Sequence, residues 1–290
     1  MVTAAFEDTY LPMVVRLNQA SVAKRYEAHR DVDWDGHDAR IDARDPRFAL
    51  AATSPLGGTS WYQSLPADTR AELGLDFTCQ ALRVGISFEA CLSRGLLEFA
   101  GALPNGSPTY RYAMHEVIEE SHHSMMFHEF IRRSGRDPEG VSRVETWAQG
   151  RVAHLGVTFP ELFFLCTLTG EVFIDHDNRE RLRERDSLHP TLRRILQIHV
   201  TEEARHVCFA NGYLREHLPR ASRLRRFALR KIAGPLLRRG EQLMLWPTPA
   251  LVRRYAVPSR VVAAAFGPRS AHAATVKRVV APIHELLASA

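Results

Sequence analysis

Two copies of the pattern Glu-x-x-His, far apart in the sequence, constrain what this chain can fold into. The first copy, Glu120 and His123, lies in the segment HEVIEESHHSMMFHEF, and the second, Glu203 and His206, lies in HVTEEARHVCFANG. Residues three positions apart share one face of a helix, with about 5–6 Å between their Cβ atoms, so both side chains can reach one metal ion. One such match is usually coincidence, whereas two matches on separate helices predict a metal site if further ligands can be found.

The phase of the first helix decides which of its side chains face the interior. Glu119 and His122 form a second, overlapping Glu-x-x-His pair. The residues one or two turns from Glu120 are mainly apolar, whereas those around Glu119 include a histidine and another glutamate. We therefore expect Glu120 and His123 to face inward, with His122 as the alternative ligand.

Long helical segments separated by turn-forming sequences predict an all-α chain. Four segments have the helical pattern, and none has convincing strand alternation. These segments are residues 70–101, 109–134, 158–184 and 190–217. The sequence LPNGSP separates the first two, DSLHP separates the last two, and a looser break at 135–151 separates the pairs. The pattern predicts two helical hairpins.

The remaining segments are expected to flank these hairpins. We expect a helix at residues 10–30, a loop at 31–60 and further helix within 240–289, interrupted by WPTP and VPS. The predicted organisation is a single domain with a bundle core at about 70–217. An N-terminal extension at 1–69 and a C-terminal helical extension at 218–290 complete it.

Hairpin geometry predicts where two further glutamates should lie. Facing residues of an antiparallel hairpin are equidistant from the turn, so Glu120 should face a residue near position 90, and Glu203 a residue near position 172. Glu89 and Glu171 occupy these places. Glu98 is the rival of Glu89, but it projects from the opposite side of the helix. The separations in the two hairpins, 31 and 32 residues, indicate an internal duplication of one half-site.

The resulting donor set suits two hard to borderline metal ions such as iron or manganese. Helical bundles that bind two metals use a Glu-x-x-His motif from each of two helices and one Glu from each of two others. Four buried carboxylates would be very costly without cations. His199 lies one turn before Glu203 and can add a third imidazole. The expected ligands are Glu89, Glu120, His123, Glu171, His199, Glu203 and His206.

Glu119 and Glu202 directly precede the two ligand glutamates of the Glu-x-x-His motifs. We expect each of them to accept a hydrogen bond from the ligand histidine of the opposite motif. Such a bond would fix the tautomer of the imidazole.

The composition is that of an ordinary globular chain. Its 290 residues are 45% hydrophobic and 24% charged, which is enough to bury a substantial core. No apolar run approaches the roughly 20 residues that span a bilayer, and the N-terminus does not resemble a signal peptide. The four cysteines form no CxxC pair, so a disulfide framework or zinc-thiolate site is not expected. A cytoplasmic location fits these features.

A basic stretch follows the last predicted bundle helix. Residues 215–260 contain twelve Lys or Arg against two Glu, within a net charge of +5 for the chain. A solvated helix face explains this stretch most simply, although it could also meet phosphates, anionic lipid or an acidic carrier protein. No nucleic-acid-binding motif accompanies the charge, so nucleic acid is not an expected partner. The sequence leaves the oligomeric state open, including a homodimer.

The order of the candidate ligands resembles the p-aminobenzoate N-oxygenase (AurF-type) family of ferritin-like di-iron oxygenases. That order is Glu89, Glu120-x-x-His123, Glu171 and His199-x-x-x-Glu203-x-x-His206. The histidine four positions before the last glutamate is the most specific feature, because that family is known for a site of four Glu and three His. All seven have a match here, and the matching part covers roughly residues 75–215.

The resemblance implies a ferritin-like bundle that holds two iron ions, uses O2 as co-substrate and takes electrons from an external donor. It implies oxidation of an (aryl)amine through hydroxylamine toward a nitroso or nitro product. It fixes neither the substrate nor any catalytic residue beyond the metal ligands, and a mixed Mn/Fe pair accepts the same ligands. As a neutral, electron-donating ligand, His199 is expected to favour N-oxygenation over attack on strong C–H bonds.

Three other interpretations remain open at this point. A di-iron hydroxylase or desaturase could act on an aliphatic or carrier-bound substrate, docked through the basic stretch. A metal-storage or peroxide-detoxifying protein would use the same ligands with no organic substrate. A basic nucleic-acid-binding protein would make the acidic cluster coincidental. The radical-bearing ribonucleotide reductase subunit fits less well, because Phe127 stands where that family has its tyrosine.

Overall fold

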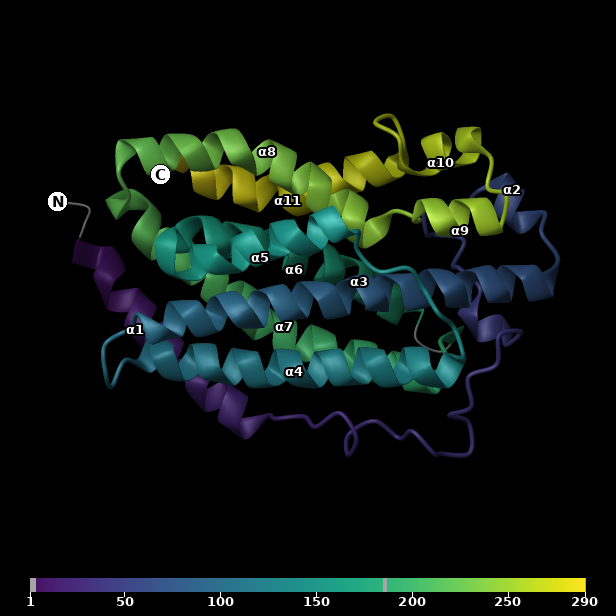
Figure 1. The fold of residues 1–290 in the computed structure, drawn as a ribbon, viewed down its shortest axis with the longest axis horizontal. Helices are drawn as coiled ribbons and strands as arrows, with labels where there is room; N and C mark the ends of the chain where they lie inside the picture. Colours follow the sequence, from purple (N-terminus) through teal and green to yellow (C-terminus); the bar gives the residue numbers. More distant parts are fainter. Residues whose placement is uncertain (1–3, 185–186, 290) are drawn as a thin grey trace.

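Helices form the regular structure of the described part of the chain. The computed structural model of the protein describes residues 4–184 and 187–289, and no strand occurs within these ranges. The all-α prediction is therefore confirmed. The α-helices, labelled in Figure 1, are α1 (Ala4–Ala23), α2 (Ser60–Gln63), α3 (Ala67–Gly101), α4 (Pro108–Ser134), α5 (Arg143–Thr158), α6 (Pro160–Arg183), α7 (Pro190–His217), α8 (Arg223–Leu245), α9 (Pro249–Arg254), α10 (Ser259–Phe266) and α11 (Ala271–Ser289). The short 3₁₀ helices η1 (Pro46–Phe48) and η3 (Leu218–Arg220) lie between them.

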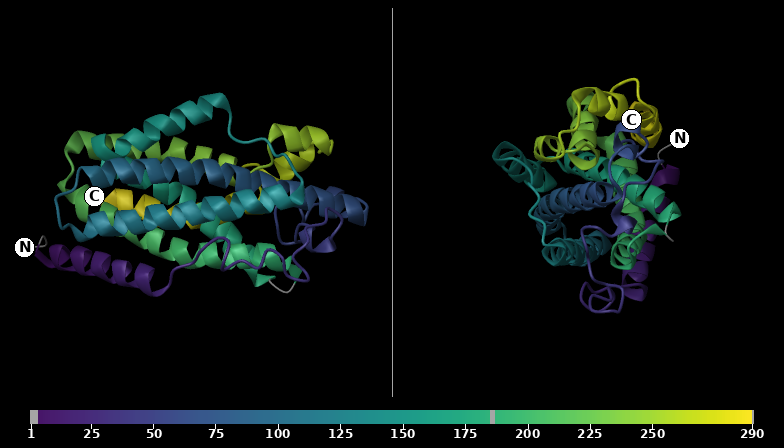
Figure 2. Two further views of the ribbon diagram at one scale, coloured as in Figure 1. Left: turned by 60° about the horizontal axis from the view of Figure 1, so that its bottom comes forward. Right: turned by 90° about the vertical axis from the view of Figure 1, so that its right-hand side faces the viewer.

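Two long antiparallel hairpins form a four-helix bundle at the centre of the molecule. Helix α3 packs along α4, and α6 packs along α7. The hairpins meet through contacts of α4 with α7 and of α3 with α6. Figures 1 and 2 show these four helices running side by side along the long axis. The predicted bundle core is thus confirmed.

Local sequence signals explain where the bundle helices begin and end. Helices α4 and α7 both begin with a proline, whose fixed φ and missing N–H suit the first turn of a helix. Gly106, in the turn before α4, and Gly135, at the end of α4, both have positive φ values, of 78° and 64°. Glycine tolerates this conformation without steric cost. The predicted boundaries of α4 and α7 agree with the observed ones to within a residue.

Two of the predicted boundaries outside the bundle are wrong. The loose break at 135–151 contains the first half of α5, which begins with a capping box between Ser142 and Glu145. Helix α5 buries only Ala153 and Gly156 fully, so it lacks the apolar periodicity that would have revealed it. The N-terminal helix ends at Ala23 rather than near residue 30. Helix α8 begins at Arg223, within the predicted C-terminal helical extension, and most of its basic residues lie on an exposed helix face.

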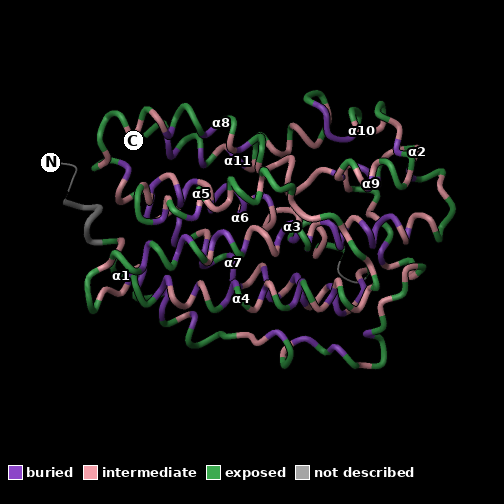
Figure 3. The backbone as a smooth tube through the Cα atoms, viewed as in Figure 1, coloured by how far each residue is buried: buried purple, intermediate pink, exposed green. Residues whose placement is uncertain are grey.

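The bundle interior consists of a polar layer between two apolar layers. Figure 3 shows buried residues recurring along the bundle helices. On α4, buried Tyr112 lies on one side of the Glu120 motif and Phe130 on the other. On α7, Ile195 and Phe209 flank the second motif in the same way. Tyr112 and Phe209 pack with their ring centroids 4.5 Å apart. Burial of these large side chains provides most of the driving force that closes the bundle around its polar centre.

The terminal helices cover the bundle from outside. Helix α1 packs on α4 and α7, while α8 and α11 pack on α6. Polar contacts join α9 to α3, since the buried Asp76 accepts a hydrogen bond from Tyr255 (2.7 Å) and pairs with Arg254 (3.2 Å). Within the described ranges, no helix has the combined length and hydrophobicity that crossing a bilayer requires.

The crossing of α3 and α5 depends on two glycines. A Cβ atom on Gly156 would overlap the backbone carbonyl of Gly95. We predict that Gly156→Ala lowers the free energy of unfolding by about 1–3 kcal/mol, because backbone must move to relieve the overlap. Gly150, on the same helix, has open space around it, so Gly150→Ala should raise stability by about 0.5–1 kcal/mol. Urea denaturation of both variants tests this, and equal effects would contradict it.

Candidate metal centre

The four bundle helices bring all seven predicted ligands into one buried cluster. Each has an exposed fraction of 0% or 1%. In one group, the donor atoms of Glu89, His123, His199 and Glu203 all lie within 4.8 Å of one another. Glu89, Glu120 and Glu171 form a second group with the same property. His206 belongs to a third group together with Glu120. The mirrored hairpin positions thus converge on one centre.

Two of the glutamates lie between the two imidazoles of the Glu-x-x-His motifs. One carboxylate oxygen of Glu120 is 2.9 Å from Nδ1 of His123, and the other is 2.9 Å from Nδ1 of His206. Glu203 is arranged in the same way, at 3.3 Å and 3.2 Å. Each carboxylate therefore presents one oxygen toward each imidazole. With this arrangement, Glu120 and Glu203 could each provide oxygen donors to two neighbouring metal ions.

The second ring nitrogen, Nε2, of each motif histidine contacts a carboxylate outside the seven predicted ligands. Nε2 of His123 lies 3.0 Å from Glu202, and Nε2 of His206 lies 2.8 Å from Glu119. Each partner comes from the opposite motif, as the sequence suggested. If Nε2 donates its proton in these bonds, Nδ1 presents its lone pair to the interior. The sequence analysis did not identify Arg205 as part of this site. Its guanidinium lies 2.8 Å from Glu119 and 3.5 Å from Glu202.

His199 faces the cluster through Nε2. This nitrogen lies 3.5 Å from both Glu89 and Glu203. Its Nδ1 lies 3.3 Å from the side-chain amide of the buried Asn178, a second residue that the sequence did not reveal. Asn178 lies two helical turns after Glu171 on α6, so it shares the inward face of that helix. The amide fixes the orientation of the imidazole, because its Nδ2–H group donates to Nδ1 of His199. With the amide turned over, Oδ1 would instead accept a hydrogen bond from Nδ1–H, as binding of a metal through Nε2 would require.

Burial and mutual charge shift the pKa values of the cluster. Burial raises the pKa of Glu89 and of Glu171 well above the usual value, and neighbouring carboxylates add to the effect. Burial lowers the pKa of His199 to about 4. Burial alone would also lower the pKa of His123, but its contacts with Glu120 and Glu202 raise it to about 10. Without metal, the cluster therefore holds protons on some carboxyl groups and on some imidazoles.

The unpartnered polar atoms of the cluster fit metal ions. Both carboxylate oxygens of Glu89 and of Glu171, and Nε2 of His199, are buried without a hydrogen-bond partner. A buried polar group without a partner carries a free-energy penalty of about 1–3 kcal/mol, and more if it is charged. Two divalent cations would satisfy these atoms and balance four carboxylates. Oxygen and imidazole nitrogen donors in this ratio suit iron or manganese.

Glu116 is a further buried carboxylate that the sequence reading missed. Its exposed fraction is 1%, and its donor atoms lie within 4.8 Å of those of Glu120 and His206. Burial raises its pKa to about 8. Its position one turn before Glu120, on the same helix face, is the signal that could have identified it. His199 stands in the same relation to Glu203.

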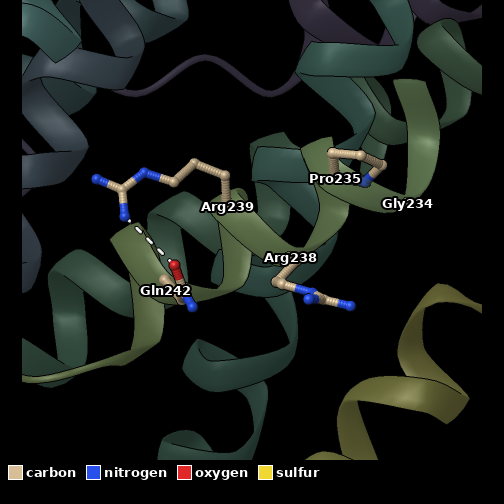
Figure 4. Close-up of a pocket in the computed structure, with 5 residues that line it drawn as sticks. All are labelled: Gly234, Pro235, Arg238, Arg239 and Gln242. Carbon is tan, nitrogen blue, oxygen red and sulfur yellow. Dashed lines mark hydrogen bonds between the residues drawn. The ribbon is translucent and has the colours of Figure 1, made fainter. Parts of the chain in front are cut away.

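Two surface pockets formed by the described residues lie away from these ligands. A pocket of about 430 Å³ is lined only by residues of α8, among them Arg238 and Arg239, whose side chains diverge over it (Figure 4). A second pocket, of about 290 Å³, is lined by side chains that include His29 and Met125. None of the seven predicted ligands lines either of them. The four cysteines are free and lie outside the cluster.

Comparisons with known proteins agree with the ligand pattern. The sequence matches the family model described as p-aminobenzoate N-oxygenase AurF over residues 7–290. Proteins of Mycobacterium bovis and Mycobacterium tuberculosis, described only as uncharacterized, are 41% identical over 218 residues, or 75% of this chain. The chain spans 64% of the length of these relatives.

A solved structure has a similar fold. It is the R2-like ligand-binding oxidase from Sulfolobus acidocaldarius, with a TM-score of 0.51 and 11% sequence identity. The likeness covers 92% of this chain and 90% of that one. At this identity it establishes the ferritin-like fold alone.

The protonation of the metal-free cluster predicts that metal binding releases protons. Glu89, Glu171, His123 and His206 all have raised pKa values, and each must lose a proton to act as a ligand. We expect these four groups to release about four protons per chain at pH 7, and we expect the metal affinity to increase as the pH rises. Calorimetric titration of the apoprotein in buffers of different ionisation enthalpy measures this number. Binding without proton release would contradict the predicted charge state.

Proposed function

Because the chain belongs to the p-aminobenzoate N-oxygenase AurF family, we propose that it is a di-iron, O2-dependent N-oxygenase. Its substrate would be an arylamine or related amine, oxidised through a hydroxylamine toward a nitroso or nitro product. The observation that carries this proposal is that two buried carboxylates, Glu120 and Glu203, each contact both motif imidazoles within a cluster of three buried histidines. Family membership supports the reaction class, and the donor set supports the metals.

The seven predicted ligands would divide between two ion positions. Glu89, His123 and His199 would serve the first position, and Glu171 and His206 the second. The oxygens of Glu120 and Glu203 would serve both. The bound pair supplies the capacity to reduce O2 with electrons from an external donor, which the carboxylate and imidazole side chains lack. Manganese in one position is compatible with the same donors.

The protein's own groups would orient the reactants and exclude water. Glu119 and Glu202 would hold the two motif imidazoles with Nδ1 directed inward. The apolar layers on either side, including Phe127 and Phe209, keep the polar centre dry. A low-polarity environment strengthens the electrostatic interactions of the charged centre. Phe127 stacks 5.3 Å from the His199 ring and offers no phenol that could form a tyrosyl radical.

The exposed basic face of α8 favours a second candidate function. A hydroxylase or desaturase acting on a carrier-bound substrate would use this face to dock an acidic carrier protein. Helix α8 carries seven Lys or Arg against one Glu and packs on α6, the helix of Glu171. Turnover of carrier-bound substrate that falls as salt is raised, while a free substrate is unaffected, would favour this function. An acidic electron donor could use the same surface.

His199 should separate N-oxygenation from simple metal binding. We predict that the iron-loaded protein, given O2 and a reductant, converts one or more members of a panel of arylamines into hydroxylamine, nitroso or nitro products. His199→Ala should lower this rate at least about tenfold, because a lost ligand weakens metal binding and activity by that order or more. Product analysis by mass spectrometry with labelled O2 measures both.

The matched control is His154→Ala, which removes an exposed histidine paired with Glu98. This control should keep the wild-type rate. An His199→Ala variant that retains both metals and full N-oxygenase activity would sink the proposed role of this residue. If the wild type oxidises no amine in the panel, the N-oxygenase proposal fails, and the carrier-bound alternative is favoured instead.

A further inference from the structure

The two metal-motif helices carry the same short sequence pattern, and it extends beyond the Glu-x-x-His motifs. Residues 116–123 read EVIEESHH, and residues 199–206 read HVTEEARH. The valine, both glutamates and the final histidine coincide. In this register Glu116 of α4 corresponds to His199 of α7.

The contacts of Glu116 and His199 are equivalent when α4 and α7 are interchanged. His199 lies with Glu203 of its own helix and with His123 of the opposite motif. Glu116 likewise lies with Glu120 of its own helix and with His206 of the opposite motif. The outer carboxylates are related in the same way, since Glu119 of α4 contacts His206 of α7 and Glu202 of α7 contacts His123 of α4. Glu116 and His199 therefore occupy equivalent places around the two ion positions.

The number of donors also differs between the two positions unless Glu116 is included. The first position has five candidate donors, namely Glu89, Glu120, His123, His199 and Glu203. The second position has four candidate donors besides Glu116, namely Glu120, Glu171, Glu203 and His206. Both oxygens of the Glu116 carboxyl group are buried without a hydrogen-bond partner. A carboxyl group in this state is expected to bind a cation, because an unpartnered buried polar group is unfavourable.

We propose that Glu116 is a fifth donor to the second ion position, the carboxylate counterpart of His199. This inference rests on the proposed metal centre and extends it from seven ligands to eight, five for each ion. It makes the centre chemically asymmetric, with two imidazoles at the first position and one at the second. The second position is then the harder site, with more oxygen donors, and should favour the harder cation of an unlike pair.

Metal binding to the apoprotein tests this assignment without reference to turnover. The experiment is an anaerobic titration with Co(II), whose visible absorption reports coordination number, followed by competition with a chelator. We expect the wild type to bind two ions and Glu116→Gln to bind the second ion at least tenfold more weakly, with the first unchanged. The spectrum of the second ion should change in the variant. Glu161→Gln is the control, since this buried glutamate pairs with Arg225 outside the cluster.

Stability of the metal-free protein distinguishes a ligand from a structural group. The amide of Glu116→Gln is close in size to the carboxyl group that it replaces and carries no charge, so the metal-free variant should unfold at about the same temperature as the wild type. Glu116→His provides a second variant, which should retain the affinity for the second ion to within a few-fold but alter its spectrum. The variant would thus have an imidazole at both equivalent places.

Unchanged affinity and an unchanged Co(II) spectrum in both variants would overturn the assignment of Glu116. If the wild type binds no pair of ions, the failure lies with the metal centre itself. If the wild type binds two ions and the variants do so equally well, only the eighth ligand is excluded.

Discussion

The structure depends on the enclosure of a carboxylate and imidazole cluster inside an apolar bundle. Such a cluster is unfavourable in a protein interior unless cations or protons neutralise it. The raised pKa values of Glu89 and Glu171 indicate protons, and the unpartnered donor atoms indicate cations. The fold meets this constraint by burying the cluster between two layers of large apolar side chains. Those layers contribute the hydrophobic free energy that offsets the unfavourable burial of the centre.

The same constraint explains why the outer carboxylates and Arg205 matter. Glu119 and Glu202 set the direction of the motif imidazoles, and Arg205 offsets part of the negative charge of these two carboxylates. Charge would therefore be balanced in two steps, by cations at the proposed centre and by a buried arginine beside it. The duplication of the hairpins then repeats this design on both halves, with Glu116 and His199 as the point where the halves differ.

The bundle and the seven candidate ligands could be predicted from the sequence because several signals agreed. Proline and glycine marked the ends of the long helices, and hairpin symmetry located Glu89 and Glu171 from the two motifs. Helix α5 could not be predicted in the same way, because it buries few apolar residues and its cap lay within a polar break. Asn178 and Arg205 have no local signal, since their roles arise from contacts between different helices. Glu116 did have a signal, in the repeated octapeptide, but the search for Glu-x-x-His motifs alone does not reveal it.

The most direct test of the account is the metal content of the protein produced with iron, together with the absorption spectrum after O2 is added to the reduced, anaerobic form. The account predicts about two iron ions per chain, in line with the bundle sites that this motif pair builds, and a long-lived visible band after O2 addition. No bound metal in the purified protein, and no uptake of iron by the apoprotein, would contradict it. The buried cluster would then have to be explained by protons alone.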